Sequence, residues 1–149
     1  MATKRLAHSL LFEMGRGNIN FQTGAFRIIL MQAGYTFNRF THAKYSNVSG
    51  SELATGNGYT ATGNVLTPST GWVQQDDQNR ATVSWANSSW TADGGDIGPT
   101  KAAIILQWNN GSPADSLVVG AFEFDDAVTV SNGISFQLQD LGFDLKQAD

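Results

Sequence analysis

What the chain lacks narrows the classes of protein to which it can belong. It contains no cysteine, which excludes disulfide bonds, a thiolate nucleophile and a cysteine-ligated metal. Charged residues make up 15% of the 149 positions, well below the usual level of about 25%, which excludes a coiled coil and a charged disordered chain. We therefore expect a single folded domain that is held together by packing, with no metal and no cofactor.

Long apolar runs are also missing. No run approaches the roughly 18 apolar residues that are needed to cross a bilayer. His8 and Glu13 interrupt residues 1–17 where a signal peptide has its apolar core. These absences predict a soluble protein without an export signal and without a membrane partner.

Charge is distributed unevenly along the chain, although the net charge is only −4. Residues 1–44 carry six basic side chains against one acidic, whereas residues 45–149 carry three basic against twelve acidic. Such polarity can orient a protein on a partner or align subunits head to tail. The overall acidity, without a Lys/Arg cluster among aromatics, predicts that nucleic acid is not a partner.

Residues 1–17 are expected to form an N-terminal helical segment. An apolar residue recurs every four positions, which predicts an amphipathic helix over Arg5–Met14 that ends at Gly15. A helix of about ten residues is marginal in water on its own, so it needs a surface, either its own sheet or another subunit. Its apolar stripe and the basic residue that follows are the candidate partner contact: Leu6, Leu10, Leu11, Met14 and Arg16.

Residues 18–149 are expected to form one β domain, because the apolar period changes to two and turn residues separate the runs. Ala25–Gln32 and Arg80–Ala86 have the alternation of half-buried strands. Ala102–Trp108 and Leu117–Phe122 are apolar on both faces, which indicates central strands that are covered on two sides. The residues expected to be buried are Trp85, Ile104, Leu106, Trp108, Val119, Phe122 and Phe136.

Eight to ten short strands without helices between them predict an all-β fold. We expect an antiparallel β-sandwich or a partly closed barrel with a short N-terminal helix. Within the long connection Thr41–Glu52, the spacing of His42, Tyr45 and Val48 allows a single helical turn. His42 is expected to pack against Tyr35 or Tyr45.

Catalytic patterns are weak throughout the sequence, so we expect that the chain is not an enzyme. Neither histidine is accompanied by a nucleophile motif of the type Gly-x-Ser-x-Gly. Glu123 and Asp125 share a strand face and keep a glycoside hydrolase open as a minor alternative, although an acidic strand end explains them better. The Asp93-Gly-Gly-Asp96 segment is typical of a turn and lacks the acid spacing of a calcium loop.

Four tryptophans keep a second alternative open. Trp85 and Trp108 fall on inward faces, whereas Trp72 and Trp90 border turns and are candidates for exposure. Exposed tryptophans stack on sugars, so a carbohydrate-binding module for host attachment is an alternative function.

Several segments, taken together in their order, span nearly the whole chain. They are Leu10–Phe21, Phe26–Gln32, Tyr35–Phe37, His42, Val48–Gly50, Gly58–Leu66, Val83–Trp85, Trp90–Gly95, Ala103–Leu106, Leu117–Phe124 and Gly133–Leu138. The first of them resemble the pattern of a family of small structural proteins of tailed bacteriophages, which is a short helix, Gly, a strand, Tyr-Thr, a His, Val-x-Gly and Gly-Tyr-Thr-x-Gly-Gly before a strand. Asn64 here stands in place of the second Gly of that doublet, and the later segments correspond to the family as well.

The resemblance implies a virion component without catalytic residues. It implies a decoration or cement protein on the capsid surface, assembled in the host cytoplasm, with the major capsid protein as its partner. A neck or tail position, with neck or tail proteins as partners, is the alternative within the same class. A capsid lattice offers three-fold sites, so we expect self-association as a symmetric oligomer, with a trimer as the first candidate.

Overall fold

A computed structural model describes residues 2–146 of the chain. In this part of the protein 49% of residues are in strands and 13% in helices, and no barrel closes. All strand pairs are antiparallel. The fold is therefore all-β and sandwich-like with a short helix, as predicted.

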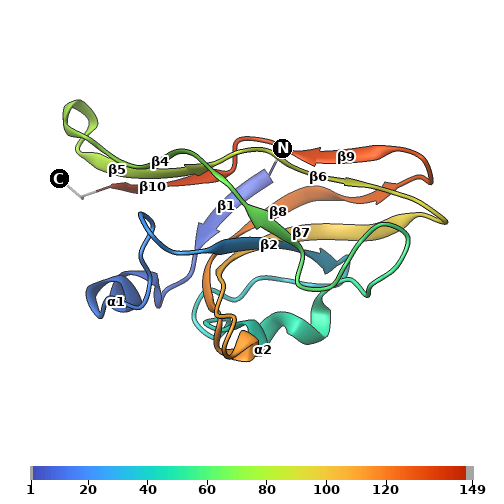
Figure 1. Cartoon of the computed structure of the whole chain (residues 1–149), viewed down its shortest axis with the longest axis horizontal. Helices are drawn as coiled ribbons and strands as arrows, with labels where there is room; N and C mark the ends of the chain where they lie inside the picture. The colour runs from blue at the N-terminus through green and yellow to red at the C-terminus, as the bar shows by residue number, and fades with distance from the viewer. Residues whose placement is uncertain (1, 147–149) are drawn as a thin grey trace.

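A five-stranded sheet forms the middle of the molecule (Figure 1), with the strand order β1-β8-β7-β2-β3. Its two long strands, β7 and β8, are joined through a short 3-10 turn, η3, and make its centre. The elements of this sheet are β1 (Ala2–Leu6), β2 (Phe26–Gln32), β3 (Asn64–Leu66), β7 (Ile97–Gln107), η3 (Pro113–Asp115) and β8 (Leu117–Val130).

Two smaller sheets lie along one face of the central sheet (Figure 1). One has the order β10-β5-β4 and the other pairs β6 with β9. Together they form the second layer of the sandwich. The elements are β4 (Pro68–Gln75), η2 (Asp76–Gln78), β5 (Arg80–Trp85), β6 (Ser88–Thr91), β9 (Ser135–Leu138) and β10 (Gly142–Lys146).

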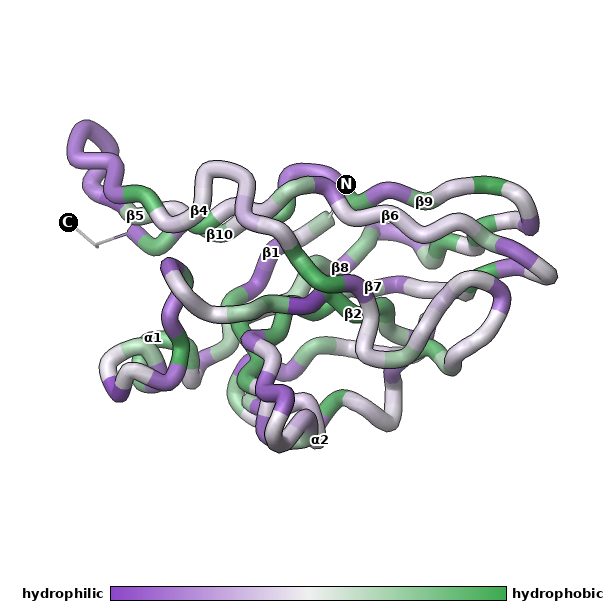
Figure 2. Tube along the Cα trace, viewed as in Figure 1, coloured by the Kyte–Doolittle hydropathy of each residue, from purple (hydrophilic) through white to green (hydrophobic). Residues whose placement is uncertain are grey.

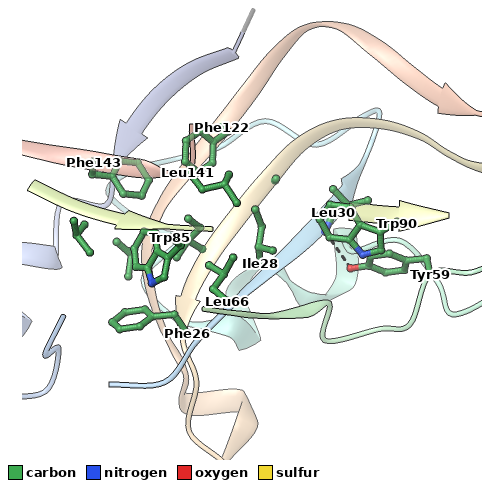
Figure 3. Packing of buried hydrophobic residues seen from close by; sticks show 14 of the residues in the cluster. Phe26, Ile28, Leu30, Tyr59, Leu66, Trp85, Trp90, Phe122, Leu141 and Phe143 are labelled. Atoms are coloured by element: carbon green, nitrogen blue, oxygen red, sulfur yellow. Dashed lines mark hydrogen bonds between the residues drawn. The ribbon is translucent and has the colours of Figure 1, made fainter. Parts of the chain in front are cut away.

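The main core fills the space between these layers (Figure 3). Successive residues of a strand point to opposite faces, so Ile28 and Leu30 of β2 belong to this core. Phe122 of β8 stacks on Phe143 of β10, with ring centroids 5.1 Å apart. Figure 2 shows that hydrophobic residues concentrate in the central strands and hydrophilic ones at the tip of the β4–β5 hairpin.

A second core lies on the opposite face of the central sheet. Ile29 and Met31 of β2 and Ile104 of β7 pack there against Phe37 and Val48. The connection that covers this face contains α2 (Tyr45–Val48) and η1 (Ser49–Ser51), so the predicted helical turn is confirmed. The predicted covering of β7 and β8 on both faces is confirmed as well.

Some expectations about individual segments are wrong. Residues 2–6 do not begin a helix, because they pair with β8 as strand β1, and the helix α1 is limited to Leu10–Gly15. Strand β2 is buried on both faces rather than half-buried, since the 33–48 connection covers its second face. Trp108 and Phe136 are only partly buried, whereas Trp85, Ile104, Leu106, Val119 and Phe122 are buried as expected.

Candidate protein interaction site

The five predicted contact residues fall into two groups, one that packs against the core and one that is exposed. Leu10 is 1% exposed and belongs to the main core, and Leu6 and Met14 pack partly against that core. Leu11 and Arg16 are exposed. Of the two surfaces left open for the apolar stripe, the protein's own fold therefore takes Leu6, Leu10 and Met14, while Leu11 and Arg16 stay available to a partner.

The outer face of α1 carries an exposed apolar pair. Leu11 is 68% exposed and Phe12 is 64% exposed, because Leu10 takes the inward position of this short helix. The guanidinium carbon of Arg16 lies 5.4 Å from the centroid of the Phe12 ring. A cation over an aromatic face is attracted by the ring quadrupole, so Arg16 stays at this surface.

A loop from a different part of the chain extends the same surface. The backbone N–H of His8 donates to the carbonyl oxygen of Arg39 at 2.8 Å. The rings of His8 and Phe40 are 5.0 Å apart, and Arg39 lies over the Phe40 ring at 5.6 Å. Phe40 is 68% exposed. Residues 37–42 thus place a second exposed aromatic ring and a second arginine beside the start of α1.

Hydrogen bonds within the loop fix its shape. The side-chain oxygen of Asn38 accepts from the backbone N–H groups of Phe40 and Thr41 at 3.0 and 3.3 Å. The Asn38 N–H donates to Nδ1 of His42 at 3.1 Å, and the Tyr35 hydroxyl lies 2.8 Å from the same nitrogen. Phe40 and Arg39 are therefore carried by an ordered turn.

These bonds define the state of the imidazole. Nδ1 of His42 receives a backbone N–H, so it is the unprotonated acceptor, Tyr35 donates to it and Nε2 carries the proton. Burial lowers the pKa of His42. Burial, and then the charge of Glu123, raise the pKa of the Tyr35 hydroxyl. The predicted packing of His42 against Tyr35 is confirmed, with stacked rings 5.4 Å apart.

We call this surface the basic end and define it by six residues. All six are exposed, three of them are large and apolar, and two are arginines: His8, Leu11, Phe12, Arg16, Arg39 and Phe40. Arg39 and Arg5 also line two shallow depressions beside it, one along β1 and β10 and one along residues 36–42. The arrangement suits a partner surface that is apolar in its centre and acidic at its rim.

The side chains considered for catalysis make contacts that hold the fold. His8 lies at the basic end, and His42 holds the loop through Tyr35. Glu123 faces Arg5, with Oε1 at 3.3 Å from Nε. Within residues 2–146 no three His, Cys, Asp or Glu side chains cluster as a metal ligand set, and no helix there has the length and apolar character to span a membrane.

The two tryptophans considered for sugar binding do not form an exposed platform. Trp90 is buried in the main core and stacks with Phe136 at 6.3 Å, so its expected exposure is wrong. Trp72 is partly buried and packs on Phe21 at 5.2 Å. Both indoles serve the packing of the sandwich.

A buried carboxylate, not anticipated from the sequence, anchors the long connection on the central sheet. Glu52 accepts hydrogen bonds from the hydroxyls of Tyr45 and Tyr59 at 2.5 and 2.7 Å and from the N–H of Thr62 at 2.7 Å. The Tyr59 hydroxyl accepts in turn from the N–H of Leu30 in β2 at 3.0 Å. Burial and the charge of Glu52 raise the pKa of both tyrosines.

The sequence analysis also did not identify most residues of the basic end. Phe12 carried a usable signal, because two adjacent apolar residues, Leu11 and Phe12, cannot both face inward when Leu10 does. Phe40 and Arg39 carried none, since a single aromatic in a polar loop is more often buried. Their position beside His8 depends on a contact between segments about thirty residues apart.

No protein-family model, no curated protein and no solved structure matches the chain.

Proposed function

We propose that this chain is a structural protein of a tailed-bacteriophage virion, acting as a capsid decoration or cement protein. In this role it binds repeated sites on the head surface as a symmetric oligomer. The observation that carries the proposal is the basic end, a surface on which three exposed large apolar side chains lie beside two arginines.

The chemistry of the basic end supports assembly rather than a small ligand. Exposed ion pairs contribute only about 0–1 kcal/mol each, so Leu11, Phe12 and Phe40 supply most of the affinity and the arginines set orientation. Repetition of a modest contact over a lattice gives stable attachment without a deep pocket.

The alternatives from other classes have less support. A sugar-binding module needs an exposed aromatic platform, and Trp90 is buried in the core. A glycoside hydrolase needs Glu123 and a second carboxylate free across a cleft, whereas Glu123 is paired with Arg5. A neck or tail position belongs to the same class and is separated from the head position by the experiment below.

Immunogold electron microscopy tests the proposal on particles made by the genome that encodes the chain. An antibody against the purified protein is expected to label the head surface. Label confined to the neck or tail would replace the decoration role with the neck or tail alternative. Purified particles that contain none of this protein by mass spectrometry would overturn the proposal altogether.

Binding to particles that lack the protein tests the surface itself. The double substitution Leu11→Ser and Phe40→Ser is expected to reduce binding at least about tenfold, because both side chains are exposed and contribute little to folding. Val65→Ser is the matched control, since Val65 is 65% exposed on β3 and lies outside the basic end. Equal loss in both variants would show that the basic end is not the contact.

A further inference from the structure

A second exposed surface of opposite charge lies at the other end of the molecule. Ile134 is 58% exposed, and Asp93 and Asp96 are exposed close to it. None of the ion pairs found within residues 2–146 involves either aspartate. We call Asp93, Asp96 and Ile134 the acidic tip.

Backbone hydrogen bonds hold the acidic tip together. The N–H of Ala92 donates to the carbonyl oxygen of Ile134 at 2.9 Å, and the N–H of Gly133 donates to the carbonyl oxygen of Ala92 at 2.8 Å. A carboxylate oxygen of Asp96 accepts from the N–H of Asn132 at 2.9 Å. The three side chains of the tip are thus presented by two turns that are bonded to each other.

The two surfaces lie far apart (Figure 1). Helix α1 is at one end of the long axis, and the turns that join β6 to β7 and β8 to β9 are at the other. A surface at each end, with opposite charge and an exposed apolar centre, is the arrangement that a head-to-tail contact requires.

We infer that copies of this chain associate head to tail, with the basic end of one copy on the acidic tip of the next. The inference deepens the proposed function and rests on it for the expectation of an oligomer. A two-fold contact through the basic end would bring Arg16 and Arg39 against the same residues of a second copy, which like-charge repulsion disfavours. A head-to-tail contact instead pairs these arginines with Asp93 and Asp96.

The geometry of this contact has a consequence for assembly. A head-to-tail interface uses two different surfaces, so each copy retains one free surface of each kind until the assembly closes. If the rotation between neighbouring copies brings the last copy back to the first, the assembly is a ring with cyclic symmetry. If it does not, the assembly is a filament. A ring matches the symmetric oligomer expected of a protein seated on a capsid symmetry axis.

Two variants of the full chain, each blocked at one end, test the inference. Arg39→Ser with Phe40→Ser blocks the basic end, and Asp93→Asn with Ile134→Ser blocks the acidic tip. These side chains are exposed, so both variants are expected to fold with the circular dichroism spectrum of the wild type. Mass photometry and sedimentation velocity then measure the oligomeric state.

The expected results distinguish a head-to-tail contact from any two-fold contact. The wild type forms oligomers, and each variant alone associates at least roughly tenfold more weakly. An equimolar mixture of the two variants forms a dimer that goes no further, because one intact basic end meets one intact acidic tip. Val65→Ser, outside both surfaces, assembles as the wild type does.

Three outcomes would overturn the inference. They are a wild type that stays monomeric, an acidic-tip variant that assembles as the wild type does, and a mixture that gives no dimer. A monomeric protein that still labels phage heads through the basic end would overturn head-to-tail association while leaving the proposed function intact. If the wild type forms oligomers and the mixed variants stop at a dimer, but the protein is absent from virions, the proposed function is overturned and head-to-tail association stands.

Discussion

Substitution of Glu52 by Gln removes the charge of the buried carboxylate while keeping its shape. One carboxylate oxygen accepts from Tyr59 and Thr62 and the other accepts from Tyr45. In the variant the amide oxygen still accepts two bonds, but the amide nitrogen then faces the Tyr45 hydroxyl, which must turn to accept. The substitution therefore weakens three bonds without creating a cavity.

The size of the effect follows from the loss of charge at these bonds. Hydrogen bonds to a charged group contribute about 1.5–3 kcal/mol each, roughly twice as much as neutral ones. Loss of charge assistance in three bonds is partly offset because a neutral amide is easier to bury. We expect the free energy of unfolding to fall by about 1–3 kcal/mol in Glu52→Gln, and by about 3–5 kcal/mol in Glu52→Ala, which leaves buried donors without acceptors.

Urea unfolding followed by tryptophan fluorescence measures these changes, and the melting temperature should fall by roughly 2–4 °C per kcal/mol. Tyr45→Phe is the matched control, because it removes a single donor at a partly exposed position and should cost about 1 kcal/mol. A Glu52→Gln protein that unfolds within about 0.5 kcal/mol of the wild type would refute the role given to the carboxylate.

Three further predictions concern packing, backbone conformation and pH. Phe122→Ala should cost about 3–5 kcal/mol in urea unfolding, and a loss below about 1 kcal/mol would contradict its place in the core. Gly63→Ala should lower the free energy of unfolding by about 2–4 kcal/mol, because φ is +67° and the added Cβ would collide with a backbone carbonyl of β2. The control Gly15→Ala adds its Cβ in open space and should be neutral or slightly stabilising. Burial lowers the pKa of His42 in the folded state, so the unfolded chain takes up the proton first as the pH drops. The free energy of unfolding should therefore fall as the pH drops through and below 6.5. Thermal melts of His42→Gln should show a weaker dependence of stability on pH over that range.

Strand prediction succeeded where the side-chain pattern had one interpretation. Ala102–Trp108 is apolar on both faces, and β7 is covered on both faces as that pattern requires. Val83 and Trp85 point into the core as their alternation predicts. Each inference needed only a periodicity of two and the burial of apolar area.

Prediction failed where one pattern fitted two structures. Leu6 and Leu10 are four residues apart, which fits a helix, yet Ala2 and Leu6 also share one face of the strand that pairs with β8, and both pack against the main core. Partner strands decide between the two, and the sequence does not reveal which strand lies alongside. The burial of Trp90 has the same origin, because it depends on Tyr59 and Phe136 from distant segments.

The same tertiary contacts explain why the basic end is suited to binding. The N–H of Ala7 donates to the carbonyl oxygen of Val119 at 3.0 Å, which fixes the start of α1 on the central sheet, and Leu10 anchors the helix in the core. Asn38 and His42 fix the loop that carries Phe40. The backbone that presents the exposed aromatic rings is thus ordered during folding, so less conformational entropy is lost when a partner binds. A six-residue helix that is marginal in isolation is held in place because strand β1 precedes it in the sheet.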